Sequence, residues 1–283
     1  MSVRNESGTI TLGGDQTIHR LGFGAMRLTG DGILGPPPDE SAAVALIETA
    51  LELGIDLIDT ADSYGPGTSE RLLGRSGAPE DALVASKAGL LRNSDGDWIP
   101  HGDPEYLLNQ VLCSRDRLGV DTIDLYQFHR PDPDVPFVES IEAFASMQQR
   151  GHVRHVGLSN VSREQLATAR DRMEIVSVQN RYHLGDRRHE PVLGACEAAG
   201  IAFIPWGPLT PLRNRPPEQL LTVADELDAT PAQTALAWLL EHSPVICPIP
   251  GTASREHLRE NVKASQLSLS ADQRDRLDAI DPV

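Results

Sequence analysis

Residues 122–159 read TIDLYQFHRPDPDVPFVESIEAFASMQQRGHVRHVGLS, and this stretch contains the pattern that decides the fold. The apolar runs over 122–129 and 153–159 have the length and composition of β-strands, whereas residues 136–149 between them have the periodicity of a helix. Gly151 follows that helix and ends it. A strand, a helix and a strand in this order predict two parallel strands joined by a right-handed crossover.

The same alternation continues in both directions along the chain. We expect six further strands, over residues 21–28, 56–60, 82–87, 175–179, 201–206 and 245–250. We expect the other helices over residues 39–53, 69–74, 104–118, 162–173, 190–199, 217–228 and 231–242, with two more beginning at Arg255 and Ala271. This arrangement predicts a closed (β/α)8 TIM barrel with an extra helix at its C-terminus. An open doubly wound sheet is the alternative, but Gly22 and Gly24 lack the third glycine of a dinucleotide-binding loop.

A short hairpin precedes the barrel. Residues 9–12 and 17–20 are strand-like and flank Gly13-Gly14-Asp15-Gln16, a sequence typical of a turn. We expect this hairpin to cap one end of the barrel. No linker or low-complexity segment divides the chain, which predicts a single domain over residues 1–283.

The composition excludes several classes of protein. The net charge of −16 disfavours nucleic acid and anionic lipid as partners. No apolar run reaches the roughly 20 residues that cross a bilayer, and residues 1–8 lack an apolar signal core. The cysteines are odd in number and widely spaced, at positions 113, 196 and 247, so we expect no disulfide framework and no metal site. A cytoplasmic protein, either a monomer or a weak homo-oligomer, is the expectation.

Four titratable side chains follow consecutive strands of the predicted barrel. Asp59 ends the second strand, Tyr64 lies in the loop beyond it, Lys87 ends the third strand and His129 ends the fourth. The carboxyl ends of the strands in such a barrel meet at one rim, which is where active sites lie. We therefore expect these four side chains to converge.

The chemistry of this set is that of a tuned proton donor. A free tyrosine has a pKa of about 10, and a nearby ammonium lowers that pKa by stabilising the phenolate. A carboxylate keeps the lysine charged, and a histidine hydrogen-bonds a substrate carbonyl. Only Lys87 and Lys263 are lysines among 25 basic residues, so a lysine that follows an apolar run indicates a role that arginine does not fill.

Each of these residues also has a structural interpretation. Asp59 is as readily a helix cap or a buried hydrogen-bond acceptor, while Tyr64 alone is more often a packing residue and His129 alone a structural one. Their joint position at the ends of neighbouring strands favours the catalytic interpretation.

Seven ordered motifs resemble the aldo-keto reductase family, and together they cover about residues 9–281. The motifs are GIDLIDTADSYGPGTSERLLG (54–74), VASKAG (84–89), DLYQFHRPDP (124–133), VGLSN (156–160), VQNRYH (178–183), FIPWGPL (203–209) and IPGTASREHLREN (249–261). The resemblance implies that Tyr64 is the acid in reduction, that Lys87, paired with Asp59, lowers the pKa of Tyr64, and that His129 orients the carbonyl.

The resemblance also implies a nicotinamide cofactor, with NADPH expected ahead of NADH. Trp206 would stack on the nicotinamide ring, and Ser159, Asn160 and Gln179 would hydrogen-bond its carboxamide. The other implied cofactor-binding residues are Gly24, Ala25, Met26, Gly207, Pro208, Leu209, Gly251, Thr252, Arg255, His257, Glu260 and Asn261. The resemblance places the pyrophosphate along Gly207 to Leu209. It places the adenosine 2′-phosphate near Thr252, Arg255 and His257, at the N-terminus of a helix, and the adenine against Glu260 and Asn261.

The sequence departs from the family pattern at two cofactor positions. Gly251 stands where many NADPH-dependent relatives have a lysine, and His257 stands where many have an arginine. Arg255 is expected to compensate, because a guanidinium binds phosphate with two parallel hydrogen bonds.

The expected substrate is a small carbonyl compound. Trp98, Trp206, Met26 and Phe128 are expected to form an apolar pocket for an aromatic or medium-sized aldehyde. The GPPP and SDGDWIP segments resemble pyridoxal reductase-like members of the family, which makes pyridoxal a candidate beside a sugar or a natural-product ketone. The alternatives are a regulatory protein that binds the cofactor and turns over slowly, and a lyase or isomerase that uses Lys87 as a Schiff-base amine.

Overall fold

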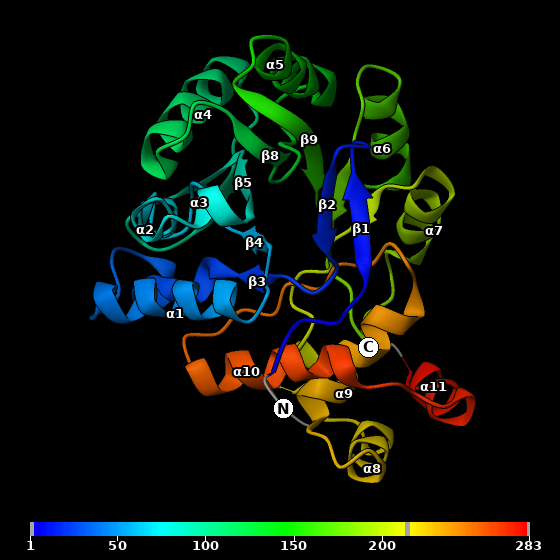
Figure 1. The fold of residues 1–283 in the computed structure, drawn as a ribbon. Helices are drawn as coiled ribbons and strands as arrows, with labels where there is room; N and C mark the ends of the chain where they lie inside the picture. Colours follow the sequence, from blue (N-terminus) through cyan, green and yellow to red (C-terminus); the bar gives the residue numbers. More distant parts are fainter. Residues whose placement is uncertain (1–2, 213–215, 282–283) are drawn as a thin grey trace.

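A computed structural model describes residues 3–212 and 216–281 (Figure 1). The first two residues of the polar segment 1–8 thus lie outside the described residues. A curved sheet of seven parallel strands forms the centre, and its spatial order, β11-β10-β9-β8-β5-β4-β3, follows the chain. Its strands are β3 (Phe23–Gly24), β4 (Leu57–Asp59), β5 (Leu83–Ala88), β8 (Ile123–Phe128), β9 (Val153–Ser159), β10 (Ser177–Gln179) and β11 (Ala202–Phe203).

An eighth extended segment, residues 245–250, closes the sheet into a barrel. On one side, the Phe203 amide donates to the carbonyl of Val245 at 2.8 Å, and the Cys247 amide donates to the carbonyl of Phe203 at 2.8 Å. On the other side, the amides of Gly22 and Gly24 donate to Pro248 and Pro250 at 2.9 and 3.3 Å. Prolines have no N–H to return, so this contact has hydrogen bonds in one direction only. The predicted (β/α)8 barrel is confirmed.

The helices form a ring around the sheet (Figure 1). Buried apolar side chains such as Phe144 and Trp238 fill the layer between the helices and the sheet. Side-chain caps begin several helices, as at Ser162 and Thr230, whose hydroxyls accept from the backbone amide three residues later. The helices are α1 (Glu40–Glu52), α2 (Thr68–Ser76), α3 (Ala78–Asp81), α4 (Pro104–Leu118), α5 (Phe137–Gln149), α6 (Arg163–Arg170), α7 (Glu190–Ala199), α8 (Glu218–Glu226), α9 (Pro231–His242), α10 (Arg255–Lys263) and α11 (Ala271–Asp278).

The N-terminal hairpin closes one end of the barrel. It consists of β1 (Thr9–Leu12) and β2 (Gln16–His19), which pair antiparallel and cross in front of the strands in Figure 1. Leu12 and Ile18 pack into the barrel interior against residues that begin the strands, among them Leu57, Leu83 and Ala202. The hairpin therefore lies at the amino ends of the strands and leaves the carboxyl ends open.

Several segments differ from the sequence prediction. Of the strand expected over residues 201–206 only Ala202–Phe203 forms β11, and the short helix α3 was not predicted. The expected strand over residues 21–28 is only two residues long, because Ala25–Leu28 turns into the 3₁₀ helix η1. A hairpin that was not predicted, β6 (Leu90–Arg92) and β7 (Trp98–Pro100), follows β5. Its three-residue strands are too short to show a hydrophobic period.

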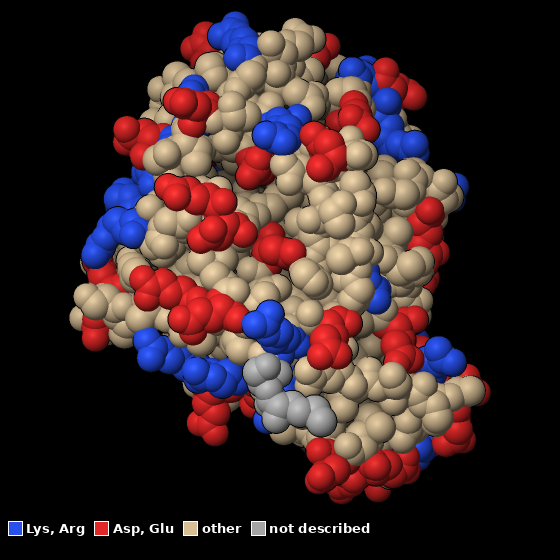
Figure 2. Space-filling model, viewed as in Figure 1, with Lys and Arg blue, Asp and Glu red and all other residues tan. Residues whose placement is uncertain are grey.

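Acidic and basic side chains are interspersed over the face of the molecule that Figure 2 shows. Among the helices of residues 3–212 and 216–281, none is both long and apolar enough to cross a membrane.

The contact between the hairpin and the barrel predicts different costs for two adjacent glycine substitutions. Gly13 and Gly14 both have left-handed backbones, with φ of 55° and 79°. A Cβ at Gly13 would lie 2.1 Å from the ring of His155, whereas a Cβ at Gly14 would meet nothing within 4 Å. We expect Gly14→Ala to cost about 1 kcal/mol of unfolding free energy, from the backbone alone. Gly13→Ala should cost about 1–3 kcal/mol more, because the ring must move.

Urea unfolding of the two variants beside the wild type measures this difference. His155 Nε2 lies 2.7 Å from the carboxylate of Asp15 in the hairpin. Moving the His155 ring therefore also weakens this contact between the hairpin and the barrel. Equal losses in the two variants would contradict this role of the hairpin.

Candidate active site

A buried ion pair lies at the carboxyl ends of β4 and β5. The Lys87 ammonium donates to Asp59 Oδ1 at 2.6 Å and to the carbonyl of Thr60 at 2.7 Å. Lys87 is 0% exposed and Asp59 is 3% exposed. The side-chain amide of Gln179 on β10 donates to the same Asp59 oxygen at 2.7 Å. Strand pairing sets this geometry, because Asp59 is in register with Ala85 and side chains two residues apart point to the same face.

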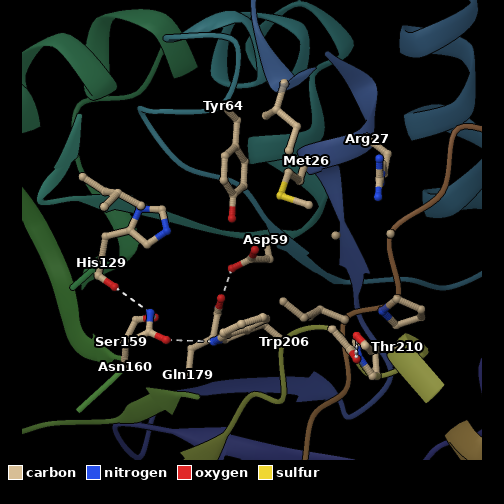
Figure 3. Close-up of a pocket in the computed structure, with 18 of the residues that line it drawn as sticks. Met26, Arg27, Asp59, Tyr64, His129, Ser159, Asn160, Gln179, Trp206 and Thr210 are labelled. Atoms are coloured by element: carbon tan, nitrogen blue, oxygen red, sulfur yellow. Dashed lines mark hydrogen bonds between the residues drawn. The ribbon is translucent and has the colours of Figure 1, made fainter. Parts of the chain in front are cut away.

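Tyr64 lies directly above this pair. Its ring centroid is 5.3 Å from the Lys87 ammonium, and its hydroxyl points toward Asp59 and the cavity in Figure 3. The rings of His129 and Trp98 approach Tyr64 edge-on, with centroids 5.9 and 6.2 Å away. The structure thus brings together the four side chains that the sequence singled out.

Burial raises the pKa of Tyr64 well above its ordinary value, and the carboxylates of Asp59 and Asp62 raise it further. The sequence had predicted the opposite direction. The physical reason is that burial of the phenol, and after it the charges of Asp59 and Asp62, outweigh the attraction of the Lys87 ammonium, which is paired with Asp59. Burial also lowers the pKa of Lys87, and the attraction of Asp59 works against that decrease. Tyr64 therefore stays protonated throughout the neutral range.

His129 is neutral in this environment. Burial lowers its pKa well below 6.5, and the charges of Lys87 and Arg130 lower it further. Its Nδ1 is 3.4 Å from the Ser63 hydroxyl. A neutral imidazole carries its proton on one of its two nitrogens. When Nδ1 accepts a hydrogen bond from the Ser63 hydroxyl, that proton is on Nε2, which is then the donor.

A cavity of about 390 Å³ opens in front of these residues. Trp206 lies across it from Tyr64 and Met26 (Figure 3). Most of the residues predicted for the site line this cavity: Gly24, Met26, Asp59, Tyr64, Trp98, His129, Ser159, Asn160, Gln179, Trp206, Gly207, Pro208, Leu209 and Gly251. Lys87 lies behind Asp59, outside the lining.

Asn160 holds the aromatic wall in place. The Trp206 indole N–H donates to Asn160 Oδ1 at 3.0 Å, and the Asn160 amide nitrogen donates to the His129 carbonyl at 3.0 Å and to the Ser159 hydroxyl at 2.9 Å. Asn160 itself has a left-handed backbone, with φ of 57°. Its amide is thus occupied by protein partners, while Ser159 and Gln179 retain polar atoms on the cavity side.

Phe128 does not line the cavity, contrary to the sequence prediction. It is buried and packs against Phe137 and Phe144 on the helix side of the sheet. Side chains alternate along a strand, so Phe128 on β8 faces the helices while Gln127 faces the opposite side.

The residues predicted for the adenosine end lie elsewhere. Arg255 and Glu260 line a separate groove of about 1090 Å³ between α10 and the α8–α9 region. Ala25 is fully buried, on the inner face of η1. Thr252, His257 and Asn261 also lie outside the lining of the first cavity.

Several residues of the cavity wall had not been predicted. They are Arg27, Ile33, Leu90, Arg130, Thr210, Ile249 and Pro250. Arg27 and Arg130 directly follow segments that were singled out, so the sequence signal for them was adjacency alone. Ile33 has a left-handed backbone with φ of 61°, which a sequence does not reveal for a β-branched residue.

The comparison with known families places the chain. Residues 20–282 match the model of the aldo/keto reductase family. The chain belongs to this family. It is 42% identical to the pyridoxine 4-dehydrogenase of Escherichia coli, with 97% of this chain and 98% of that protein covered. It is 46% identical to an uncharacterised oxidoreductase of Schizosaccharomyces pombe, with 97% and 90% covered.

Solved structures agree with this aldo-keto reductase assignment. The thermostable aldo-keto reductase Tm1743, solved with the inhibitor epalrestat, superposes with a TM-score of 0.84 at 31% identity, covering 96% of this chain and 99% of that one. An aldo/keto reductase from Klebsiella pneumoniae, solved with NADP and acetate, gives 0.81 at 25% identity, covering 97% and 96%. This aldo-keto reductase is therefore an oxidoreductase.

The buried ion pair predicts a non-additive pattern of stability. Lys87→Met leaves the Asp59 carboxylate buried with only an amide partner, which should cost about 3–5 kcal/mol of unfolding free energy. Adding Asp59→Asn to that variant should recover part of the loss, since no uncompensated charge then remains.

Urea unfolding of the wild type, both single variants and the double variant completes the cycle. Strictly additive losses would contradict an energetic coupling between Lys87 and Asp59.

Proposed function

We propose that this chain is an NADPH-dependent enzyme that reduces an aldehyde or ketone to an alcohol, with Tyr64 as the general acid. The observation that carries the proposal is the position of Tyr64. Its hydroxyl points into the cavity, above the Lys87–Asp59 pair and beside a neutral His129. Tyr64 as a proton donor and His129 as a hydrogen-bond donor thus face the same cavity, with the Lys87–Asp59 ion pair next to Tyr64.

The cavity has features that suit a nicotinamide cofactor. Trp206 offers a flat aromatic surface for the ring, and Ser159 and Gln179 offer polar atoms at its edge. Bound NADPH would supply the hydride. The Klebsiella pneumoniae relative, solved with NADP, supports this choice of cofactor.

Tyr64 would hold its proton until the carbonyl oxygen becomes basic. The carbonyl carbon accepts the hydride, and the carbonyl oxygen accepts the Tyr64 proton, which gives a neutral alcohol. The phenolate left behind lies close to the Lys87 ammonium, whose charge stabilises it. His129, as a neutral donor, would orient the carbonyl oxygen.

The substrate end of the cavity favours an aromatic aldehyde. Trp98, Met26, Ile33 and Leu90 make this part of the wall apolar. The relative that is a pyridoxine 4-dehydrogenase makes pyridoxal the first compound to test, ahead of sugars and natural-product ketones. We also propose that the enzyme works in the cytoplasm on free small molecules, as a monomer or a weak homo-oligomer.

Tyr64→Phe tests the assignment of the acid. The variant keeps the ring but has no proton to give, so we expect turnover of pyridoxal or benzaldehyde to fall at least about 100-fold. NADPH affinity, measured by the quenching of tryptophan fluorescence, should be nearly unchanged. A variant with the wild-type rate would refute the role of Tyr64.

The direction of the pKa shifts predicts how each reaction depends on pH. Reduction needs protonated Tyr64, and its raised pKa keeps it protonated, so kcat/KM for reduction should be flat from about pH 6 to 9. Oxidation of the alcohol needs the phenolate, so its kcat/KM should rise about tenfold per pH unit over that range.

Initial rates in both directions across this pH range provide the test. Neutral His129 should add no break to the reduction profile. Burial raises the pKa of the neighbouring Asp62 to about 7, so a break near 6.5 shows that His129 titrates in the ordinary way only if Asp62→Asn retains it.

A further inference from the structure

Arg27 presents its side chain to the cavity because of the geometry of η1. A 3₁₀ helix has three residues per turn, so Ala25 and Leu28 share a face, and both are buried. Met26 and Arg27 therefore lie on the other faces, and both line the cavity. Arg27 is exposed, and within the part of the chain that the structure describes its guanidinium has no hydrogen bond or ion pair. Its charge is available to a ligand.

The backbone next to Arg27 has no room for another side chain. A Cβ at Gly251 would lie 2.9 Å from the carbonyl oxygen of Gly24, and a Cβ at Gly24 would lie 2.8 Å from that of Ile249. Real Cβ atoms essentially never approach backbone so closely. The Arg27 Cγ is 3.8 Å from the same Gly251 position. Among residues 3–212 and 216–281, the cation beside this pair of glycines therefore comes from η1 and not from position 251.

The two arginines of the cavity wall lie at opposite ends. Arg130 is the neighbour of His129 in the chain, and its charge helps to lower the pKa of His129. Arg27 lies on the other side, with Tyr64 and Met26 between it and His129 in Figure 3. Gly251 lies beside Arg27, and Thr210 lines the cavity on the same side in Figure 3. The cavity thus has one cation at the carbonyl end and another at the far end.

The net negative charge of the protein makes the positive charge of Arg27 important for binding an anionic ligand. The chain has a net charge of −16, which repels an anionic ligand unless a local cation compensates. Lys87 cannot serve, because it is fully buried and paired with Asp59. Arg27 is the cation of this wall that lies away from the reacting carbonyl.

We propose that Arg27 binds the pyrophosphate of the dinucleotide cofactor, across the cavity from residues 207–210. A guanidinium suits this ligand, because its planar fork donates two parallel hydrogen bonds to phosphate oxygens. The residues predicted for the 2′-phosphate lie outside this cavity, which favours the pyrophosphate as the group that Arg27 contacts. The inference rests on the proposed function, since it requires a nicotinamide dinucleotide in this cavity.

The test is a titration of NADPH and of NADH against the wild type, Arg27→Ala, Arg27→Lys and the control Arg150→Ala. Trp98 and Trp206 line the cavity, so quenching of tryptophan fluorescence reports binding without turnover. Arg150 is an exposed arginine at the end of α5, on the opposite face of the barrel. Thermal unfolding of each variant confirms that the fold is intact.

Because the pyrophosphate is common to both cofactors, Arg27→Ala should weaken the binding of NADPH and of NADH by the same factor, roughly 10- to 100-fold. Arg27→Lys should retain part of the affinity, because it keeps the charge and loses the fork. Arg150→Ala should bind as the wild type does. The affinity of Arg27→Ala should also depend less on salt than that of the wild type.

Three results would overturn the inference while the proposed function stands. They are unchanged affinity for both cofactors in Arg27→Ala, a loss confined to NADPH, which would place Arg27 at the 2′-phosphate, and a raised KM for the carbonyl substrate with unchanged cofactor affinity. A wild-type protein that binds neither NADPH nor NADH would refute the proposed function together with the inference.

Discussion

The ion pair between Lys87 and Asp59 is the interaction on which the rest of the site depends. Two charges inside a barrel are tolerated only when each has partners, and here Thr60 and Gln179 supply the remaining hydrogen bonds. These contacts join β4, β5 and β10, so the pair also fixes how three strands present their ends. Tyr64 lies next to this ion pair, and its burial there raises the pKa of the phenol and keeps it protonated.

The two ends of the barrel have separate tasks. At the amino ends of the strands, Leu12 and Ile18 of the hairpin seal the interior with apolar contacts. At the carboxyl ends, polar side chains and the β6–β7 hairpin surround a cavity. The apolar closure of the barrel thus lies at the amino ends of the strands, and the carboxyl ends carry the polar side chains that line the cavity.

Periodicity and capping residues predicted most of the fold. The helices over 104–118, 190–199 and 231–242 have the predicted bounds, because caps and terminal glycines mark helix ends in the sequence. The convergence of Asp59, Tyr64, Lys87 and His129 also followed from their places after successive strands. The side of the sheet that Phe128 faces did not, since it depends on the register of β8. The raised pKa of Tyr64 depends on burial and on the nearby charges of Asp59 and Asp62, which sequence spacing does not reveal.

The proline-rich segment that completes the barrel has a consequence for its mechanical strength. Pro248 and Pro250 accept hydrogen bonds but return none, so the seam between the first and last strands has half the usual bonding. Gly24 and Gly251 meet at this seam, and the cavity runs along it. A ligand that contacts both η1 and the segment 207–210 would span this seam and add bonds across it.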